Sequence, residues 1–542
     1  MISDTRDRIA GGRSAWPGFA IMGVGMFMAI LDIQVVATSI PTIQRALAVH
    51  PDQVSWVQTA YLIAEVIAIP LTGLLTRLLS MRWLFVGAIT VFIAASVGCA
   101  SSASFPILIA WRVVQGFSGG TLIPAVFSAV FLLFPPSRQG IATTIAGVLA
   151  VLAPTVGPIV GGWITETYSW HWLFLINVLP GLACAVGGVA LLPVEVPDPA
   201  AGLRLDAIAL AAMAAALAAL EVALKQAPDR GWGSPAVLGL FAFSLAAGVL
   251  FIWRTLGAAH PVVDLRTLGR RDFAIGCLLS FVLGVGLFGS VYLMPVFLAY
   301  VRGHDALQIG EVMLVTGVAQ LLTAPVAVAL ERRFGARILS AFGFGLFAVG
   351  LGLSYFGTVD TDFEQMFVPQ VVRGVAIMFC LLPPTRLALG RLAAAQVPDA
   401  SGLFNLMRNL GGAIGIALID TVIYGRGPVL GRAIARRLEG GDVATARAVG
   451  IPLNMFLARA KGPIDAQTAA LVQPMIDHLA LARAIDEAWL LMAVVAALAL
   501  VCLPFAGRGA GGLNSEQARV PRPRGHIGDL VATGAHRRRG AL

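Results

Sequence analysis

Several polar side chains lie inside apolar runs that are long enough to cross a bilayer. Asp32 is the one charged residue in the run 14–44, and Glu65 lies within the run YLIAEVIAIP. Arg112 and Gln115 stand about one helical turn apart in a third run. A charge at the centre of a bilayer costs about 2.5–3.5 kcal/mol on insertion scales, so such residues usually mark ion or proton pathways. These four side chains are therefore the first candidates for chemistry.

Proton transfer is the chemistry that suits a carboxyl group inside a membrane. The group escapes the cost of its charge by taking up a proton, and it can release that proton when its access to water changes. We therefore predict that Asp32 couples proton flow to transport, with an interhelical hydrogen bond as the structural alternative. A helical rise of about 1.5 Å per residue places Asp32 somewhat past the middle of its span, toward the outside.

The other three candidates leave more than one interpretation open. Glu65 is either a second proton site or cation-binding group, or else an interhelical hydrogen-bond partner. Arg112, which we place in the inner-to-middle part of its span, would favour the charged form of Asp32 or Glu65 when close to it. Gln115 would share a hydrogen-bond network with Arg112 and the carboxylate. The alternative for Arg112 is a packing role, with its guanidinium extended to the membrane surface.

The composition requires lipid as the solvent for most of the chain. Of its 542 residues, 58% are hydrophobic and 12% are charged, against roughly 25% charged in soluble domains. The net charge of +9 does not indicate nucleic-acid binding, because the Arg residues fall between the apolar runs and not on one face. The five Cys lack CxxC spacing and the seven His are scattered, so we expect no disulfide framework, metal site or cofactor.

The apolar runs predict an all-α integral membrane protein with fourteen transmembrane helices. Each spanning helix needs about 20 mostly apolar residues. The predicted spans are 16–40, 55–76, 83–101, 106–131, 141–164, 171–193, 204–224, 235–255, 272–300, 308–330, 337–357, 366–386, 402–424 and 485–506.

The distribution of Lys and Arg predicts which side each loop faces. The short loops on the side of the N-terminal segment 1–15 carry far more Arg than those on the other side, so that side is cytoplasmic. The tail 507–542 returns to the same side, and its Gly, Arg and Pro content predicts disorder. The loop 425–484 is extracytoplasmic, and the run DAQTAALVQPMIDHLALARAIDEAW within it favours a helix. That helix would lie on the membrane surface or against a partner. The alternative is a helical plug over its own bundle.

An internal repeat at an offset near 255 residues divides the chain into halves. Its clearest pair is Gly116 with Gly374, which are 258 residues apart. We predict a first six-helix bundle at 16–193, two inserted helices at 204–255, and a second six-helix bundle at 272–506. The matching segments are 113–124 with 371–383, 157–162 with 411–415, and 77–82 with 331–337. Arg373 then stands near the place of Arg112 in the second half, as a weaker candidate for the same role.

Five motifs in order resemble the major facilitator superfamily and, more narrowly, its fourteen-helix drug:proton antiporters of the Emr/Qac type. The similarity is dense over the first six helices and depends on helix count and the repeat beyond them. The motifs are LDIQVVATSIPTIQRAL (31–47), WVQTAYLIAEVIAIPLTGLL (56–75), WRVVQGFSGG (111–120), APTVGPIVGG (153–162) and SWHWLFLINVLPG (169–181).

The resemblance implies a fold of two six-helix bundles and a proton-coupled exporter of lipophilic drugs or toxic compounds that works by alternating access. The alternative is a dedicated exporter of one metabolite, such as a siderophore, an antibiotic or a fatty acid. Small residues in the motif of the fifth helix let helices approach closely, and the resemblance implies a tight seam between the bundles that supports antiport. These residues are Pro154, Gly157, Pro158, Gly161 and Gly162.

The loop between the second and third helices departs from the wider superfamily pattern. The superfamily places an Asp that latches the cytoplasmic gate where this chain has Arg77, and Ser80 replaces a Gly, while Gly73 and Arg82 are kept. With Arg77 in that position, the latch cannot work in the same way. Emr-type members are similarly basic here, so the departure agrees with the narrower family.

Enzymatic and scaffold functions are not expected. The loops carry no cluster of His, Asp and Glu, and G-x-x-x-x-G-K-[ST] is absent, which argues against ATP as the energy source. A scaffold would not need charged groups inside the bilayer. We expect a multi-pass protein of the inner, or plasma, membrane. The resemblance also implies a periplasmic adaptor and an outer-membrane channel as partners, with 425–484 as the docking surface.

Overall fold

The computed structural model describes residues 15–49, 51–194, 206–259, 261–458 and 466–506, all of which belong to one compact unit. These residues form helices and connecting turns, and no strand occurs among them. The predicted all-α architecture is confirmed. The expectations for residues 1–14 and for the tail 507–542 lie outside the described residues.

The first half of the fold contains one helix that reverses its direction. The chain turns back at Ser80, whose φ of 68° and ψ of 161° are not helical, so α5 supplies two antiparallel arms. Tyr61 of the first arm and Phe92 of the second both border Gly119, which is possible only if the arms lie side by side. The elements are α2 (Trp16–Thr38), α3 (Ile40–Leu47), α4 (Pro51–Val54), α5 (Trp56–Ala100), α6 (Phe105–Leu133), α7 (Pro136–Thr167), α8 (Trp172–Leu175) and α9 (Val178–Leu191).

The described residues contain 13 helical segments that are long and apolar enough to cross a membrane. Because α5 folds back on itself, its two arms are consistent with the expected total of fourteen spans. The inserted pair comprises α11 (Ala207–Arg230) and α12 (Pro235–Gly257). The second half consists of α13 (Arg271–Tyr300), α14 (Ala306–Phe334), α15 (Ala336–Leu353), α16 (Phe363–Leu389), α17 (Val397–Glu439) and α20 (Ala466–Cys502).

The inserted helix α11 contacts both halves of the fold. Near its end, Lys225 Nζ donates hydrogen bonds to Ser55 Oγ, at 2.8 Å, and to the Thr59 hydroxyl at the start of α5. Trp232, in the turn after α11, donates to Thr421 Oγ1 of α17 at 2.8 Å. The partner helix α12 leaves most of its side chains exposed, as expected for a helix that faces lipid. The insertion is therefore attached to both bundles through α11.

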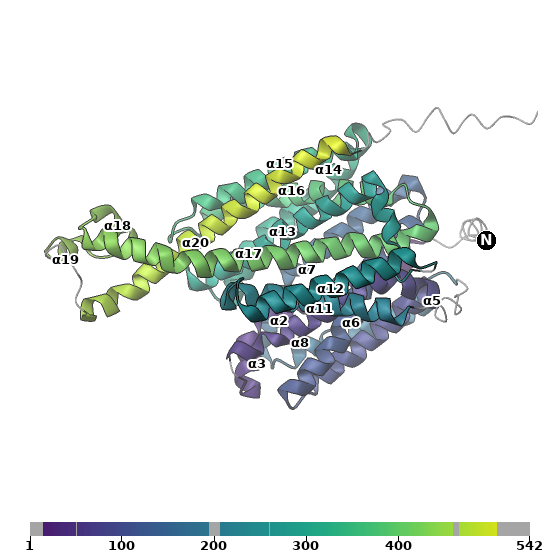
Figure 1. Cartoon of the computed structure of the whole chain (residues 1–542), viewed down its shortest axis with the longest axis horizontal. Coiled ribbons are helices and arrows are strands. Elements are labelled where there is room, and N and C mark those ends of the chain that lie inside the picture. Colours follow the sequence, from purple (N-terminus) through teal and green to yellow (C-terminus); the bar gives the residue numbers. More distant parts are fainter. Residues whose placement is uncertain (1–14, 50, 195–205, 260, 459–465, 507–542) are drawn as a thin grey trace, which may run out of the picture. The chain divides into compact units, whose positions relative to one another are not determined.

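The predicted loop 425–484 is mostly helical, which is a correction to its description as a loop. Helix α17 continues to Glu439 and α20 begins at Ala466, so the two helices extend well beyond the predicted spans. They lie side by side, with α18 (Val443–Val449) and α19 (Leu453–Ala458) at their far end (Figure 1). A small apolar cluster holds this projection together, comprising Leu438, Ala446, Val449, Ile476 and Leu479. Asp465, the first residue of the run predicted to be helical, lies outside the described residues, and α20 covers the rest of that run.

The predicted antiporter motif lies in α7, where small residues allow close packing with other helices. Gly157 faces Gln34 of α2, and a side chain at Gly157 would collide with it. On the α14 side, Gly317 faces Thr155 of α7 at similarly short range. All five motif residues named above are buried. Helix α7 therefore packs between α2, which is also in the first half, and α14, which is in the second half.

A salt bridge joins the two halves at the turn between the arms of α5. Arg77 Nη1 lies 2.5 Å from Asp399 Oδ2, and the Asp399 side chain is buried in the first turn of α17. A helix N-terminus favours a carboxylate. Gly73 packs so closely on Asp399 that any side chain there would collide with it. The departure at Arg77 is thus matched by a carboxylate on the other half, which the sequence analysis had overlooked. Arg82, the other basic residue of this motif, lies against the ring of Trp83.

We expect unequal effects when the two partners of this salt bridge are neutralised separately. Arg77→Gln leaves the buried Asp399 carboxylate without its counter-ion, which should lower the free energy of unfolding by about 1–3 kcal/mol. Asp399→Asn leaves a half-exposed guanidinium that water can reach, so it should cost less. The double variant should be no less stable than Arg77→Gln alone. Thermal unfolding of the solubilised protein measures these differences.

The matched control is Arg391→Gln, which removes an exposed ion pair with Asp272. We expect that change to cost under about 0.5 kcal/mol. Strictly additive effects of Arg77→Gln and Asp399→Asn would contradict an energetic coupling between the two side chains.

Candidate functional site

The centre of the first half is a buried ion pair between Asp32 of α2 and Arg112 of α6. Arg112 Nη1 lies 2.6 Å from Asp32 Oδ2, and neither side chain is exposed. Removing one partner of such a pair is costly because it leaves an uncompensated charge. The structure thus brings together two of the residues that the sequence singled out, which lie 80 positions apart.

Two amides complete the surroundings of the Asp32 carboxylate. Gln115 Nε2 donates to Asp32 Oδ1 at 3.0 Å, and Asn177 Nδ2 donates to the same oxygen at 2.7 Å. Gln115 Oε1 in turn accepts from Arg112 Nη1 at 2.7 Å. Gln115 Nε2 also contacts the Ser96 hydroxyl in the second arm of α5. Side chains from α2, α5 and α6, and Asn177 just before α9, therefore form one network around a single carboxylate.

Arg112 is held in place by further contacts with the first arm of α5. Its Nε donates to the carbonyl oxygen of Val57 at 3.0 Å, and its guanidinium lies 4.3 Å from the ring centre of Tyr61. Arg112 is the eighth residue of α6, counted from Phe105, so it lies nearer the start of that helix. With the predicted orientation this is the outer half of the span, which corrects the inner-to-middle placement. The fully buried side chain also excludes a guanidinium extended to the surface.

Glycines explain why α6 approaches α5 closely enough for these contacts. A side chain at Gly116 would collide with the backbone of Tyr61, and one at Gly120 would collide with the backbone of Glu65. Small residues on one face let two helices pack backbone to backbone. The motif WRVVQGFSGG thus supplies both the Arg112 and Gln115 side chains and the close contact that positions them.

Glu65 lies outside the Asp32 network. It is 3% exposed in the first arm of α5, and its carboxylate makes no hydrogen bond among the described residues. Glu65 is close enough to both Glu221 of α11 and Arg112 of α6 for their charges to act on it. Glu221 lies within α11, which continues to Arg230, and its Oε1 is buried without a hydrogen-bond partner in the part of the chain that the structure describes.

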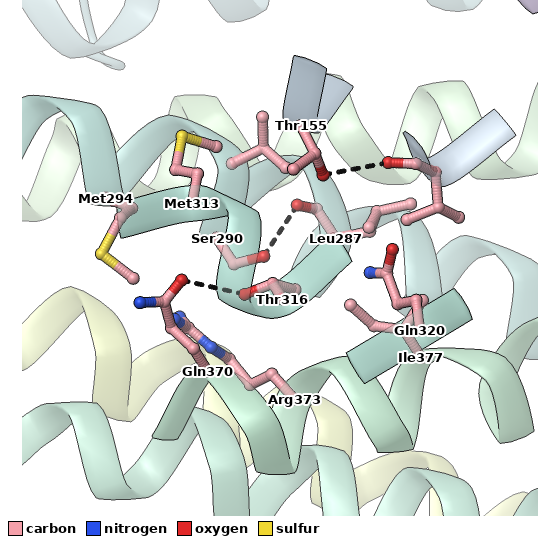
Figure 2. Close-up of a pocket in the computed structure, with 12 residues that line it drawn as sticks. Thr155, Leu287, Ser290, Met294, Met313, Thr316, Gln320, Gln370, Arg373 and Ile377 are labelled. Carbon is pink, nitrogen blue, oxygen red and sulfur yellow. Dashed lines mark hydrogen bonds between the residues drawn. The ribbon is translucent and has the colours of Figure 1, made fainter. Parts of the chain in front are cut away.

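The second-half candidate, Arg373 of α16, is also separate from the Asp32 network. Its side chain is 2% exposed and its guanidinium lies 4.5 Å from the ring centre of Trp489. It borders a cavity between α7 and the second half (Figure 2). The two halves therefore place an Arg at related points but surround it differently.

Asn177 is a member of the network to which sequence reasoning assigned no role. It lies within the quoted motif SWHWLFLINVLPG, where an amide in an otherwise apolar and aromatic run was a signal for a buried hydrogen bond. What the completed cluster can do is hold a proton at Asp32 and release it, with Arg112, Gln115 and Asn177 as fixed donors. In the part of the chain that the structure describes, His, Cys, Asp and Glu side chains form no group of three that could bind a metal ion.

Comparisons with known proteins agree with this architecture. The family model described as Major Facilitator Superfamily matches residues 22–416. Over 410 residues, the chain is 37% identical to the colistin resistance protein EmrB of Acinetobacter baumannii, covering 76% of this chain and 80% of that protein. Over 404 residues it is 30% identical to the multidrug export protein EmrB of Escherichia coli K12, covering 74% of this chain and 78% of that protein.

A solved structure shows the same fold at low sequence identity. The crystal structure of the human organic anion transporter MFSD10 (TETRAN) superposes with a TM-score of 0.59 and 14% identity, covering 91% of this chain and all of that one. Because the family model spans well over half of the sequence and the EmrB proteins align along most of their length, this chain belongs to the Major Facilitator Superfamily.

Proposed function

We propose that the chain is a proton-coupled exporter of lipophilic drugs or toxic compounds that works by alternating access. The observation that carries this proposal is the Asp32 carboxylate, which is buried and held by three donors. The similarity to multidrug export proteins of the EmrB type supports the class of substrate. A buried carboxylate that alternates between two sides of a membrane is a suitable carrier for a proton.

Protonation of Asp32 would change the network in a defined way. The ionised carboxylate accepts hydrogen bonds from Arg112, Gln115 and Asn177. Once Asp32 is protonated, its charge is gone and the attraction to the Arg112 guanidinium falls to that of a neutral acceptor. Arg112 would then lose its counter-ion and shift relative to α2. Proton binding would thereby bias the packing of α2 against α6, and release of the proton would restore it.

Alternating access also needs contacts between the halves that can open and close. Two candidates are the salt bridge Arg77–Asp399 and the close packing of α7 on α14. We assign the first to the gate at the predicted cytoplasmic side, and the second to the seam that prevents a leak. In this account Glu65 and Glu221 form a second acidic location beside α11, and Asp32 alone carries the coupling proton.

The first test of this function is drug-dependent proton movement in inverted membrane vesicles. We expect a panel of lipophilic drugs to release protons from energised vesicles that contain the wild-type protein. Asp32→Asn should abolish this response, because the amide cannot exchange a proton. Asp32→Glu should retain part of it. The readout is the fluorescence of a dye that reports lumenal pH.

A matched control for this test is Asp442→Asn, which changes an exposed carboxylate that caps α18. We expect Asp442→Asn vesicles to respond like wild type. A full response from Asp32→Asn vesicles would refute the coupling role of Asp32. Folded wild-type protein that ignores the whole panel would refute multidrug export and favour a dedicated exporter of one metabolite.

Asn177 provides a second test, directed at the position of the carboxylate. Asn177→Leu removes a donor that lies 2.7 Å from Asp32 Oδ1. A hydrogen bond to a charged group is worth about 1.5–3 kcal/mol, which corresponds to one or two units of pH in a proton equilibrium. We therefore expect the midpoint of the pH profile of transport to move by about one unit or more, while substrate binding changes little. Asn177→Gln should restore part of the profile, whereas a purely structural role would lower activity equally at every pH.

We also propose that the helical projection docks a periplasmic adaptor protein. Its far end carries exposed apolar side chains, among them Met455, Leu457 and Leu471. Exposed apolar groups that cluster at one end of a protein often mark an interaction surface. The projection packs on its own apolar cluster, so it can present these groups without support from the bilayer.

Replacing residues 440–470 with a short Gly-Ser linker tests this docking role. We expect transport in inverted vesicles to be spared, because the Asp32 network is untouched, and whole-cell drug resistance to be lost. The milder variant Leu457→Asp should reduce resistance in the same direction. An equal loss in both assays would contradict a docking function and indicate a structural one.

A further inference from the structure

A cavity between α7 and the second half collects polar donors that have no acceptor. It has a volume of about 30 Å³ and is bordered by α7, α13, α14 and α16. Figure 2 shows Gln370 and Arg373 of α16 facing Ser290 of α13 and Thr316 of α14. Met294 and Met313 supply an adjacent apolar and polarisable wall.

The hydrogen bonds around this cavity engage the Gln370 oxygen and the Ser290 hydroxyl, and the side-chain amide of Gln320 also borders it. Thr316 Oγ1 donates to Gln370 Oε1 at 3.0 Å, and Ser290 Oγ donates to the carbonyl oxygen of Leu287 at 2.9 Å. Three buried donor atoms then remain without a partner, namely Gln370 Nε2, Arg373 Nε and Arg373 Nη1. Unpaired buried donors are costly, and in native proteins they usually have a functional reason.

Unlike Arg112 in the first half, Arg373 has no carboxylate counter-ion among the described residues. Arg112 is neutralised there by Asp32. The offset of 258 residues that relates the two halves places Ser290 where the first half has Asp32, Gln370 where it has Arg112, and Arg373 where it has Gln115. Among the described residues Arg373 forms no ion pair, and its closest charge-related contact is the face of Trp489. The second half therefore keeps a buried cation and leaves out its carboxylate.

A second and larger cavity continues from the same Arg373. It has a volume of about 190 Å³, and it shares Met294 and Arg373 with the first. Its wall is rich in apolar and aromatic side chains, namely Phe297, Phe356, Met366, Pro369 and Trp489. Asp486 also borders it. Its Oδ2 lies 3.9 Å from Arg483 on its own helix, is buried without a hydrogen-bond partner, and forms no ion pair with Arg373.

We infer that Arg373 and Gln370 bind the anionic group of an amphipathic organic anion, such as a carboxylate, and that its apolar body lies along the Met and aromatic walls of the two cavities. A guanidinium and an amide nitrogen on the same helix face present the donors that a carboxylate accepts. The larger cavity, at about 190 Å³, is smaller than the roughly 300–1,000 Å³ of a drug-sized site, so the bound anion has to be small. This inference depends on the proposed export function, because it names the substrate class of the same protein.

The test compares two probes of nearly the same shape, 2-naphthylacetate and its neutral amide, 2-naphthylacetamide. Binding to the purified full-length chain in phosphatidylcholine nanodiscs is measured by isothermal titration calorimetry. We expect Arg373→Gln to weaken 2-naphthylacetate at least about tenfold and the amide less than about twofold. Arg373→Lys should be intermediate, because the charge stays and the planar fork is lost. Gln370→Leu should weaken the carboxylate selectively as well.

Arg426→Gln is the matched control, since it removes an Arg from a half-exposed ion pair with Glu487, and neither residue lines the two cavities. It should leave the affinity for both probes unchanged. Size-exclusion profiles establish that each variant is folded, and Gln370→Leu keeps the test decisive if Arg373→Gln does not fold. Equal weakening of both probes, or an unchanged affinity for 2-naphthylacetate in Arg373→Gln, would overturn the inference.

Two further arms separate the possible sources of failure. An anionic lipid headgroup offers the same chemistry, so nanodiscs with added phosphatidylglycerol are compared with phosphatidylcholine alone. If phosphatidylglycerol competes with 2-naphthylacetate but the two probes still respond differently to Arg373→Gln, the cavity is a substrate site. If the wild-type protein binds neither probe in either lipid, the inference is overturned. Drug-dependent proton release is measured in the same Arg373→Gln protein with neutral drugs. The inference is supported if Arg373→Gln still releases protons with neutral drugs but no longer binds 2-naphthylacetate. If the wild-type protein itself releases no protons, the proposed export function is refuted instead.

Discussion

The ion pair between Asp32 and Arg112 is the interaction on which the organisation of the first half depends. An isolated charge inside a bilayer is costly, so each partner requires the other, and both require the amides of Gln115 and Asn177. That requirement sets how α2, α5, α6 and the start of α9 are placed around one point. The glycines of α6 serve the same constraint, because they let Arg112 reach the backbone of α5.

The two halves repeat the same arrangement of helices, but their buried polar side chains differ. The first half has a carboxylate that is fully supplied with donors, which suits the storage and release of a proton. In the second half, Arg373 and Gln370 have donor atoms without a hydrogen-bond partner, and both residues line a cavity. If both halves carried the closed ion pair, neither would have capacity left for a ligand. The asymmetry thus allows one protein to handle a proton and a substrate at separate places.

Two contacts between the halves differ in physical kind. At the α7 to α14 contact, Gly310 and Gly317 of α14 pack closely against the Ile159 and Thr155 side chains of α7. The Arg77–Asp399 contact is a salt bridge at the turn of α5, partly open to solvent, and it connects the first half to the N-terminus of α17. A half-exposed ion pair can open at modest cost, whereas a close-packed seam separates only as a unit. That difference suits the first to gating and the second to sealing.

The sequence by itself determined the solvent, the helices, the family and four of the polar candidates. Long apolar runs have no stable alternative to helices in lipid, and a rare charge inside such a run, like Asp32, is conspicuous. The tertiary structure alone decided which polar groups meet. Asn177 joins Asp32 across 145 positions and Asp399 joins Arg77 across 322, and nothing local records such distances. The helix from Ala466 onward was predicted, but the length of α11 and the extension of α17 to Glu439 were missed. A helix that packs on protein can continue past its apolar run, and hydropathy detects only the lipid-facing part.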